Sequence, residues 1–286
     1  MDPQAPEAAE FREGQRNQWN TAATGWEKWS DLIDSGAAHI SERMVELAGV
    51  QPGSRVLDVA CGRGEPSLTA ARAAAPDGSV TATDISAEML AFGRDRAAAE
   101  GIRNIEFVES GANALDFAAG TFDAAVSRWG IIFEPDGEGA AARVRGFLKP
   151  GSRFAISSWG TPDKVPFLGI PASTTMRRLG IDPPPPGTPG PLSRPTEDAL
   201  AGLLEGGGFS GVNVQELELT FEFESPDQYT EFTRDMAAPI SAMIAAHPED
   251  VQRETWDAIT DAVREASGGD GQVELTNLVL VAAGQA

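Results

Sequence analysis

Residues 56–65, VLDVACGRGE, and residues 83–86, TDIS, decide the fold of this chain. The first segment predicts a buried strand that runs into a glycine turn, and the second predicts another strand that ends at Asp84. Gly62 and Gly64 let the backbone approach a ligand closely, because neither carries a Cβ atom. An acid at the end of the second strand is placed to accept hydrogen bonds from a ribose diol. The pattern therefore predicts a nucleoside-binding half of an open α/β sheet.

Segments with strand patterns recur along the rest of the chain, as apolar runs or, at residues 212–223, as an alternation of polar and apolar residues. The predicted strands are residues 56–60, 80–83, 105–108, 122–127, 154–157, 212–223 and 273–282. Helical patterns at residues 67–75, 86–100 and 140–148 separate the first five of them. Strands that alternate with helices at this spacing indicate βαβ units with right-handed crossovers. We therefore expect an α/β, Rossmann-like, doubly wound fold with a mostly parallel seven-stranded sheet and helices on both faces.

The charge balance of the chain is strongly acidic. Its 286 residues include 43 acidic and 22 basic side chains, a formal net charge of −21. Such a surface repels phosphate backbones, so we expect no nucleic-acid partner. No apolar run approaches the roughly 18 residues of a membrane span, and the N-terminus lacks a hydrophobic signal segment. We expect a cytoplasmic protein that acts on a small molecule, as a monomer or a homodimer.

The sequence offers little for metal or thiol chemistry. Cys61 is the only cysteine, which excludes an intrachain disulfide. It lies inside the glycine turn, where we expect it to serve packing. His39 and His247 are far apart in the sequence and form no recognisable metal motif. We therefore expect no metal site.

The glycine turn also resembles part of the dinucleotide fingerprint G-x-G-x-x-G. Gly62 and Gly64 match its first two glycines, but Ser67 stands in the third position. Asp58, inside the first strand, suits the ammonium of an amino-acid ligand and has no role toward a dinucleotide. A diphosphate on the helix N-terminus would also meet the negative charge of Glu65. These residues favour S-adenosylmethionine over a nicotinamide dinucleotide.

Four segments in order carry a resemblance to a known family. Residues 58–64, Asp84, residues 122–126 (FDAAV) and residues 148–151 (LKPG) resemble the class I S-adenosylmethionine-dependent methyltransferases. They look most similar to the branch with the ubiquinone/menaquinone-biosynthesis C-methyltransferases and bacterial small-molecule enzymes. The resemblance spans about residues 50–160. It implies an enzyme that uses S-adenosyl-L-methionine and releases S-adenosyl-L-homocysteine.

The resemblance also implies a set of cofactor contacts. Asp58 would lie near the methionine ammonium, and Asp84 would accept hydrogen bonds from the ribose hydroxyls. Gly62 and Gly64 would line the backbone of the cofactor. The full implied set is Asp58, Ala60, Gly62, Gly64, Asp84, Ile85, Met89, Gly111, Ala112, Asn113, Ser127 and Trp129.

The adenine end departs from the family pattern at one position. Related enzymes place an acid after the third strand to accept the adenine amino group, but Gly111 stands there in this chain. The backbone N–H of Ala112 and the amide oxygen of Asn113 would serve adenine instead. Ile85 and Met89 would pack on the ring, although a methionine at such a spacing is as often a core residue.

The chain divides into one core and several covers. We expect a single methyltransferase domain, residues 1–286, with residues 1–15 frayed at the N-terminus. Its parts are an N-terminal helical cover at 16–50, the cofactor-binding core at 51–160, a Pro-rich lid loop at 161–195, the rest of the core at 196–225 and 269–286, and a helical insertion at 226–268.

The covers supply apolar side chains for an acceptor pocket. Trp29, Phe167 and Met236 suit a small apolar or aromatic acceptor. Ser127 and Trp129 would flank the side of the methionine that faces this acceptor. The same three apolar side chains would equally serve to hold the covers to the core.

Catalytic groups are the least determined part of the sequence. Methyl transfer to O, N or C needs a base only when the nucleophile must lose a proton early. His39, His247 and Tyr229 are the candidates, and none is singled out by its context. Two alternatives to a methyltransferase stay open. One is a protein that binds the cofactor without methylating, such as a cyclase, sensor or scaffold, and the other is a nicotinamide-dependent oxidoreductase.

Overall fold

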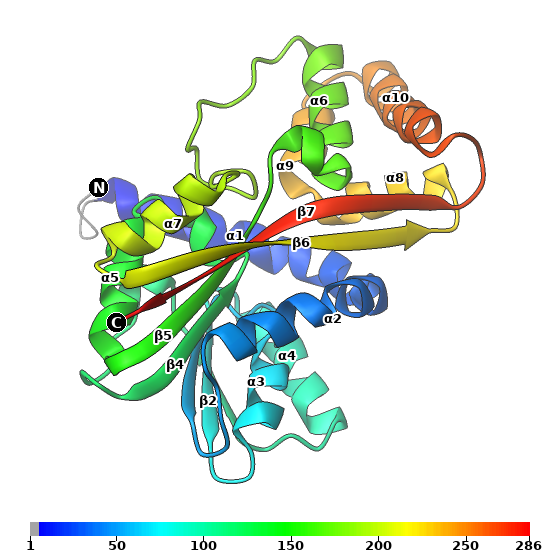
Figure 1. Ribbon diagram of the computed structural model, residues 1–286. Helices are drawn as coiled ribbons and strands as arrows, with labels where there is room; N and C mark the ends of the chain where they lie inside the picture. The colour runs from blue at the N-terminus through cyan, green and yellow to red at the C-terminus, as the bar shows by residue number, and fades with distance from the viewer. Residues whose placement is uncertain (1–5) are drawn as a thin grey trace.

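Seven strands form one sheet in the computed structural model, which describes residues 6–286 (Figure 1). They are β1 (Arg55–Val59), β2 (Ser79–Asp84), β3 (Ile105–Glu109), β4 (Phe122–Arg128), β5 (Leu148–Trp159), β6 (Ser210–Phe223) and β7 (Val273–Gln285). Their order across the sheet is β3-β2-β1-β4-β5-β7-β6. Neighbours are parallel from β3 to β5, and β7 runs antiparallel to both β5 and β6. The predicted Rossmann-like, mostly parallel sheet is confirmed.

Helices cover both faces of this sheet. They are α1 (Pro6–Lys28), α2 (Ser30–Leu47), α3 (Ser67–Ala74), α4 (Ala87–Ala99), α5 (Gly137–Phe147), α6 (Pro166–Leu179), α7 (Glu197–Gly206), α8 (Pro226–Met236), α9 (Ala238–Ala245) and α10 (Glu249–Ser267), with short 3₁₀ turns η1 (Ala112–Ala114), η2 (Ile131–Phe133) and η3 (Pro162–Lys164). Helices α2, α3 and α4 share one apolar core with the sheet, and α5 and α7 share the core on the other face.

The alternation of side chains along β1 sets the position of its buried acid. Val56 joins the core beneath α2 and α3, whereas Leu57 and Val59 join the core beneath α5 and α7. A strand covered on both faces needs apolar residues almost throughout, as β1 has. Side chains alternate with a period of two, so Asp58 shares the face of Val56. Its carboxyl group therefore points toward α3.

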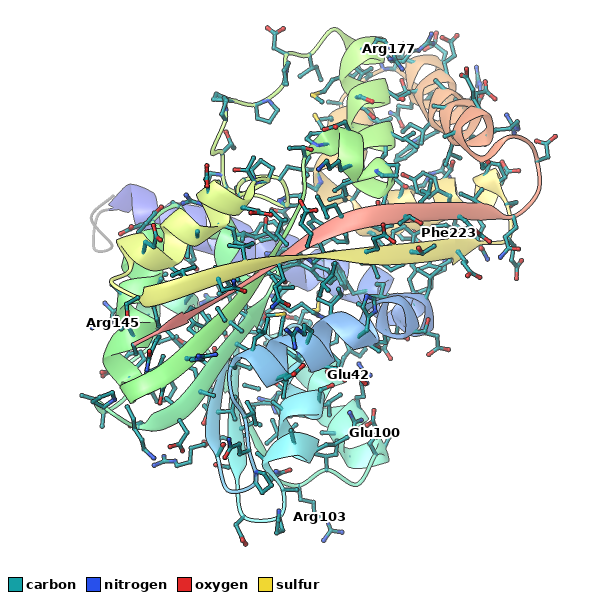
Figure 2. The ribbon with its side chains drawn as sticks, in the orientation of Figure 1. Glu42, Glu100, Arg103, Arg145, Arg177 and Phe223 are labelled. Carbon is teal, nitrogen blue, oxygen red and sulfur yellow. The ribbon has the colours of Figure 1, made fainter. Side chains whose placement is uncertain are left out.

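The distal halves of β6 and β7 run beyond the parallel strands and carry the helical insertion (Figure 1). Helices α6 and α10 contact β7, and α8 contacts β6. Phe223 closes the far end of β6 (Figure 2), where it lies edge-on to Phe232 with ring centroids 5.3 Å apart. The predicted break near residues 247–248 separates α9 from α10. Among the helices of residues 6–286, none has the length and apolarity to span a membrane.

Two local expectations are wrong. Residues 1–15 were expected to be frayed, but α1 begins at Pro6, and only residues 1–5 lie outside the described part. The predicted Pro-rich loop at 161–195 contains the 14-residue helix α6. Pro166 occupies its first turn, where the missing N–H costs nothing, and Gly180 ends it in a left-handed conformation. Only the stretch after Gly180 keeps the irregular form that its prolines favour.

Candidate functional site

The strand order reverses between β1 and β4, and unusual backbone marks both of their carboxyl ends. Ala60 and Trp129 follow these strands with φ angles of 57° and 53°. Among the described residues they alone combine a side chain with a left-handed backbone. Such conformations cost free energy and cluster at functional sites. In open α/β sheets the crevice at this reversal is where ligands bind.

The glycine turn after β1 lies against the end of β2. Gly62 and Gly64 have φ angles of 53° and 103°, which favour glycine. The N–H of Gly62 donates to Oδ2 of Asp84 at 2.8 Å. A Cβ atom added at Gly62 would meet no protein atom within 4 Å among the described residues. The turn therefore presents bare backbone to open space, as a close-fitting ligand requires.

Asp84 ends β2 and is almost fully buried. Its carboxylate accepts the N–H groups of Gly62 and Ser86, each at 2.8 Å. Burial raises the pKa of Asp84 to about 6, against the lowering effect of these backbone donors. Each carboxylate oxygen has two lone pairs, so both retain one for a further donor. Asp84 can hold the glycine turn and bind a ligand hydroxyl at the same time.

Asp58 is fully buried on β1. Ser67 Oγ donates to its Oδ2 at 2.5 Å, whereas Oδ1 has no hydrogen-bond partner among the described residues. Burial raises the pKa of Asp58 to about 7. A buried acceptor without a donor is costly, and a cationic donor would satisfy it and favour its ionised form.

The adenine end predicted from the sequence gathers after β3. Asn113 Oδ1 is buried and has no partner within the described part of the chain. A Cβ atom added at Gly111 would lie 3.7 Å from Asn113 Oδ1 and 3.6 Å from Ile85 Cδ1. Ala112, next to Gly111, and Met89, four residues after Ile85, are both buried. Ser86 caps α4 by accepting the N–H of Met89 at 3.1 Å.

The two residues predicted at the end of β4 differ in what they can offer. Ser127 is fully buried, and its hydroxyl donates to Val59 O at 2.8 Å and accepts the N–H of Ile131 at 3.0 Å. It therefore ties β4 to β1. The indole of Trp129 stacks on that of Trp159, with centroids 4.6 Å apart and planes within 1°. Its Nε1 is buried and unpartnered among the described residues.

Helix α1 crosses the carboxyl ends of the strands (Figure 1). Ser86 Oγ donates to Asn20 Oδ1 at 2.7 Å. Arg63 of the glycine turn, only 8% exposed, pairs with Glu27 at 2.7 Å and with Asp34 of α2 at 3.5 Å. Sequence reasoning missed these contacts, because polar residues on an amphipathic helix resemble a solvated face. The signal that could have revealed them is Arg63, a cation inside the glycine turn.

The three predicted catalytic candidates lie apart from this site. His39 is exposed on α2, and its Nε2 is 2.9 Å from Glu218 O. His247 lies in the turn between α9 and α10. Tyr229 is fully buried, its hydroxyl donates to Phe167 O at 2.8 Å, and burial raises its pKa. None of them joins the residues at the strand ends.

The predicted acceptor-pocket residues belong to the aromatic core of the insertion. Trp29 donates to Asp235 at 2.9 Å and lies edge-on to Phe232 at 5.3 Å. The ring of Phe167 also lies 5.3 Å from that of Phe232. Phe167 contacts Trp159 at 5.9 Å, so it is one ring removed from the Trp129 stack. Met236 is half-buried at the end of α8. In residues 6–286 no cluster of metal-ligating side chains is present.

Known proteins provide an independent comparison. The ubiE/COQ5 methyltransferase family matches residues 17–167. An uncharacterized protein of Mycobacterium tuberculosis (strain ATCC 25618 / H37Rv) is 35% identical over 242 residues, which cover 83% of this chain and 84% of that protein. This chain belongs to the ubiE/COQ5 methyltransferase family. Membership confirms the resemblance carried by the four sequence segments and is consistent with S-adenosylmethionine as the cofactor.

Other family relatives match shorter stretches. A second uncharacterized protein of that strain is 40% identical over 128 residues, so this chain spans 45% of its length. The ubiquinone/menaquinone biosynthesis C-methyltransferase UbiE of Teredinibacter turnerae is 31% identical over 157 residues, which cover 54% of this chain and 63% of that protein.

Solved structures agree on the fold. The YcgJ protein of Bacillus subtilis has a TM-score of 0.53 at 17% identity and covers 86% of this chain and 98% of its own. The [4+2]-cyclase SpnF has a TM-score of 0.53 at 16% identity and covers 93% of this chain and 96% of its own. At these identities the likeness shows the fold alone.

Proposed function

We propose that the chain is an S-adenosylmethionine-dependent methyltransferase that acts on a small, apolar or aromatic acceptor at O, N or C. The observation that carries this proposal is the order of acceptor groups along the sheet. Asn113 Oδ1 follows β3, the Asp84 carboxylate ends β2, and Asp58 Oδ1 lies on β1. The adenine amino group, the ribose diol and the methionine ammonium occur in the same order along the cofactor.

A dinucleotide fits these residues less well. Ser67, in place of the third fingerprint glycine, donates its hydroxyl to Asp58. The charge of Glu65 contributes less to this exclusion than its position suggests. It lies 3.8 Å from Arg72 and 3.7 Å from Arg96, which partly neutralise it. The exclusion of nicotinamide cofactors therefore rests on the Asp58–Ser67 pair.

The chain's own residues would position the reactants rather than exchange protons. The bound cofactor supplies an electrophilic methyl group on a sulfonium centre. Asp58 and Asp84 would anchor its two halves, and the stacked Trp129 and Trp159 rings would offer a flat apolar wall to an acceptor. Helix α1, which crosses the carboxyl ends of the strands, would exclude water from the cofactor site. Because His39 and Tyr229 lie outside the site, we assign no base to them. Positioning alone supplies much of the rate of such displacements.

The family match, the small-molecule relatives and the acidic surface support a cytoplasmic enzyme without a nucleic-acid substrate. A cofactor-binding protein without methyl transfer is the second candidate, since the fold is shared with the [4+2]-cyclase SpnF. Turnover separates the two candidates.

Calorimetry tests the proposal first. The purified protein is titrated with S-adenosylhomocysteine, and in parallel with NADH and NADPH. Micromolar binding of the homocysteine compound alone supports the cofactor assignment, and binding of a nicotinamide alone contradicts it. Formation of S-adenosylhomocysteine from the methyl donor with a panel of phenols, quinols and amines then tests transfer. Binding without turnover across a broad panel favours the second candidate.

A further inference from the structure

Helix α1 runs along the length of the proposed cofactor site. Arg16 lies 3.8 Å from Glu109 at the end of β3 and 3.4 Å from the carbonyl of Ile85 after β2. One turn later Asn20 binds Ser86. The helix then reaches the glycine turn after β1, where Glu27 pairs with Arg63. Its early residues therefore lie at the adenosine end of the site, and its last turn lies at the methionine end.

One face of α1 contacts the segment after β4. Gln15 donates to the carbonyl of Phe133 at 3.0 Å, and the ring of Trp19 lies 5.2 Å from that of Phe133. Residues four, seven and eleven positions apart share a helix face, so Trp26 lies on this same face. Its ring centroid is 6.3 Å from that of Trp19. Trp26 therefore lies between the segment after β4, which Trp19 contacts, and the turn after β1, which the next residue Glu27 contacts.

The indole N–H of Trp26 is a buried donor without an acceptor in the described part of the chain. A buried donor left unpaired is expensive, so it points to a ligand group. The acceptors at the strand ends match every donor of the proposed cofactor, but its methionine carboxylate needs donors. Trp129 Nε1 is the other unpaired indole, yet its ring is stacked on Trp159 of β5, on the side of β4 away from β1, β2 and β3.

We propose that the Trp26 indole N–H donates a hydrogen bond to the carboxylate of the cofactor's methionine, so that α1 forms part of the cofactor site. This inference rests on the proposed function. Asp58 Oδ1 on β1 then accepts a hydrogen bond from the ammonium, and the Trp26 indole on α1 donates one to the carboxylate. The Glu27–Arg63 pair, one residue away, holds the last turn of α1 against the glycine turn and so positions the indole.

The test compares two ligands that differ only at the amino-acid end. S-adenosylhomocysteine carries the carboxylate, whereas 5′-methylthioadenosine keeps adenine, ribose and thioether but lacks the amino-acid group. Trp26→Phe keeps a flat ring and removes the donor. We expect its Kd for S-adenosylhomocysteine to rise about tenfold, because hydrogen bonds to charged groups are the strong ones. Its Kd for 5′-methylthioadenosine is expected to stay unchanged.

Matched variants separate the donor from a packing effect. Trp19→Phe, on the same face of α1, is expected to leave both affinities unchanged. Trp26→His restores a ring N–H and is expected to recover part of the lost affinity. Equal weakening of both ligands by Trp26→Phe would show a packing role and overturn the proposal, as would no weakening of either. Wild-type protein that binds neither ligand would instead contradict the proposed function.

A spectroscopic measurement covers the case in which Trp26→Phe does not fold. The chain has six tryptophans, so a ¹H–¹⁵N NMR spectrum contains only six indole side-chain signals to follow. In a titration of wild-type protein, one indole signal besides that of Trp129 is expected to move downfield with S-adenosylhomocysteine but not with 5′-methylthioadenosine. Trp129→Phe identifies the signal to set aside. Identical shifts with both ligands would overturn the proposal.

Discussion

Two buried carboxylates define the site at the scale of single residues. Asp58 and Asp84 lie on neighbouring strands, and burial raises the pKa values of both, to about 7 and about 6. Ser67 and backbone N–H groups satisfy only part of each carboxylate. Burying a carboxylate whose oxygens lack hydrogen-bond donors costs free energy, and a ligand that supplies those donors would offset this cost. Their burial and their free lone pairs are therefore what supports their proposed roles toward the cofactor.

Cofactor affinity is expected to depend on pH through Asp58. In the free protein the Asp58 carboxyl is protonated below about pH 7, whereas an adjacent ammonium favours the ionised form. Binding therefore releases a proton, and affinity rises with pH. Between pH 6 and pH 8 we expect the Kd for S-adenosylhomocysteine to fall about tenfold, since each pH unit below the pKa costs up to about tenfold. Calorimetry in buffers of different ionisation enthalpy measures the proton release.

The control for this pH dependence is Asp58→Asn. The variant cannot ionise at this position, so its affinity is expected to be weaker and nearly constant over the same range. The nearby groups that also titrate or carry charge are Asp84, Glu65, Cys61 and Arg128. A profile for Asp58→Asn as steep as that of the wild type would assign the pH dependence to one of them.

Asp84→Ala is expected to weaken binding of S-adenosylhomocysteine by roughly 1–3 kcal/mol, because the ribose hydroxyls lose a charged acceptor. The Gly62 and Ser86 N–H groups lose theirs as well, so a lower Tm is expected too. Asp123→Ala is the matched control, since Asp123 lies near the amino end of β4, whereas Asp84 lies at the carboxyl end of β2. Isothermal titration compares the two. Equal Kd values for Asp84→Ala and the wild type would remove Asp84 from the site.

At the scale of elements, a turn and a helix build the site together. The turn after β1 exposes its backbone to open space at the proposed cofactor site, and α1 lies across it, held by the Arg63–Glu27 pair. The cation is buried and the anion is half-exposed. This ion pair therefore links the order of α1 to the shape of the glycine turn.

Gly62→Val is expected to abolish binding of S-adenosylhomocysteine while the far-ultraviolet circular dichroism stays that of a folded protein. The new side chain would enter the space that the ligand needs, and a β-branched residue is strained at a φ of 53°. Gly53→Val is the matched control. Gly53 also has a positive φ, of 87°, with no described atom within 4 Å of an added Cβ, but it precedes β1. Normal binding by Gly62→Val would refute the turn assignment.

Glu27→Gln is expected to loosen α1. Arg63 keeps Asp34 at 3.5 Å, so the turn should stay folded, but the last turn of α1 loses its charged anchor. We expect faster amide hydrogen exchange in α1 and a several-fold higher Kd for S-adenosylhomocysteine. Glu46→Gln, which breaks the surface pair with Arg43, serves as the control. Unchanged exchange in α1 would show that apolar contacts alone hold the helix.

At the scale of the whole molecule, the net charge of −21 opposes folding. Excess like charge destabilises the compact state, and salt screens it. We expect the Tm to rise by several degrees between 20 mM and 500 mM sodium chloride. Potassium chloride should act equally, because screening depends on ionic strength. A Tm that falls with either salt would mean that the surface ion pairs outweigh the repulsion.

The core of the fold was predictable from local patterns. Strands β1, β2 and β4 begin and end within one residue of the predicted bounds, since strands covered on both faces carry apolar runs that stand out in the sequence. Helix α6 was not predictable in the same way, because prolines favour turns in general, whereas here Pro166 fits the first turn of the helix and Pro171 is accommodated inside it. Asp58, Gly62 and Asp84 lie together at the strand ends, as their spacing requires. Their roles toward a cofactor stay predictions.

The sequence by itself determined the strand–turn–strand unit and the family, because glycine backbone freedom and an acid after a buried strand are local requirements. Only the tertiary structure decided that α1 lies across the carboxyl ends of the strands, with Trp26 next to Trp19 and one residue before the Glu27–Arg63 pair. It also decided that His39 and Tyr229 lie elsewhere. These placements depend on packing between segments far apart in the chain, such as Glu27 with Arg63. No local spacing encodes which of several polar faces a helix turns toward the core.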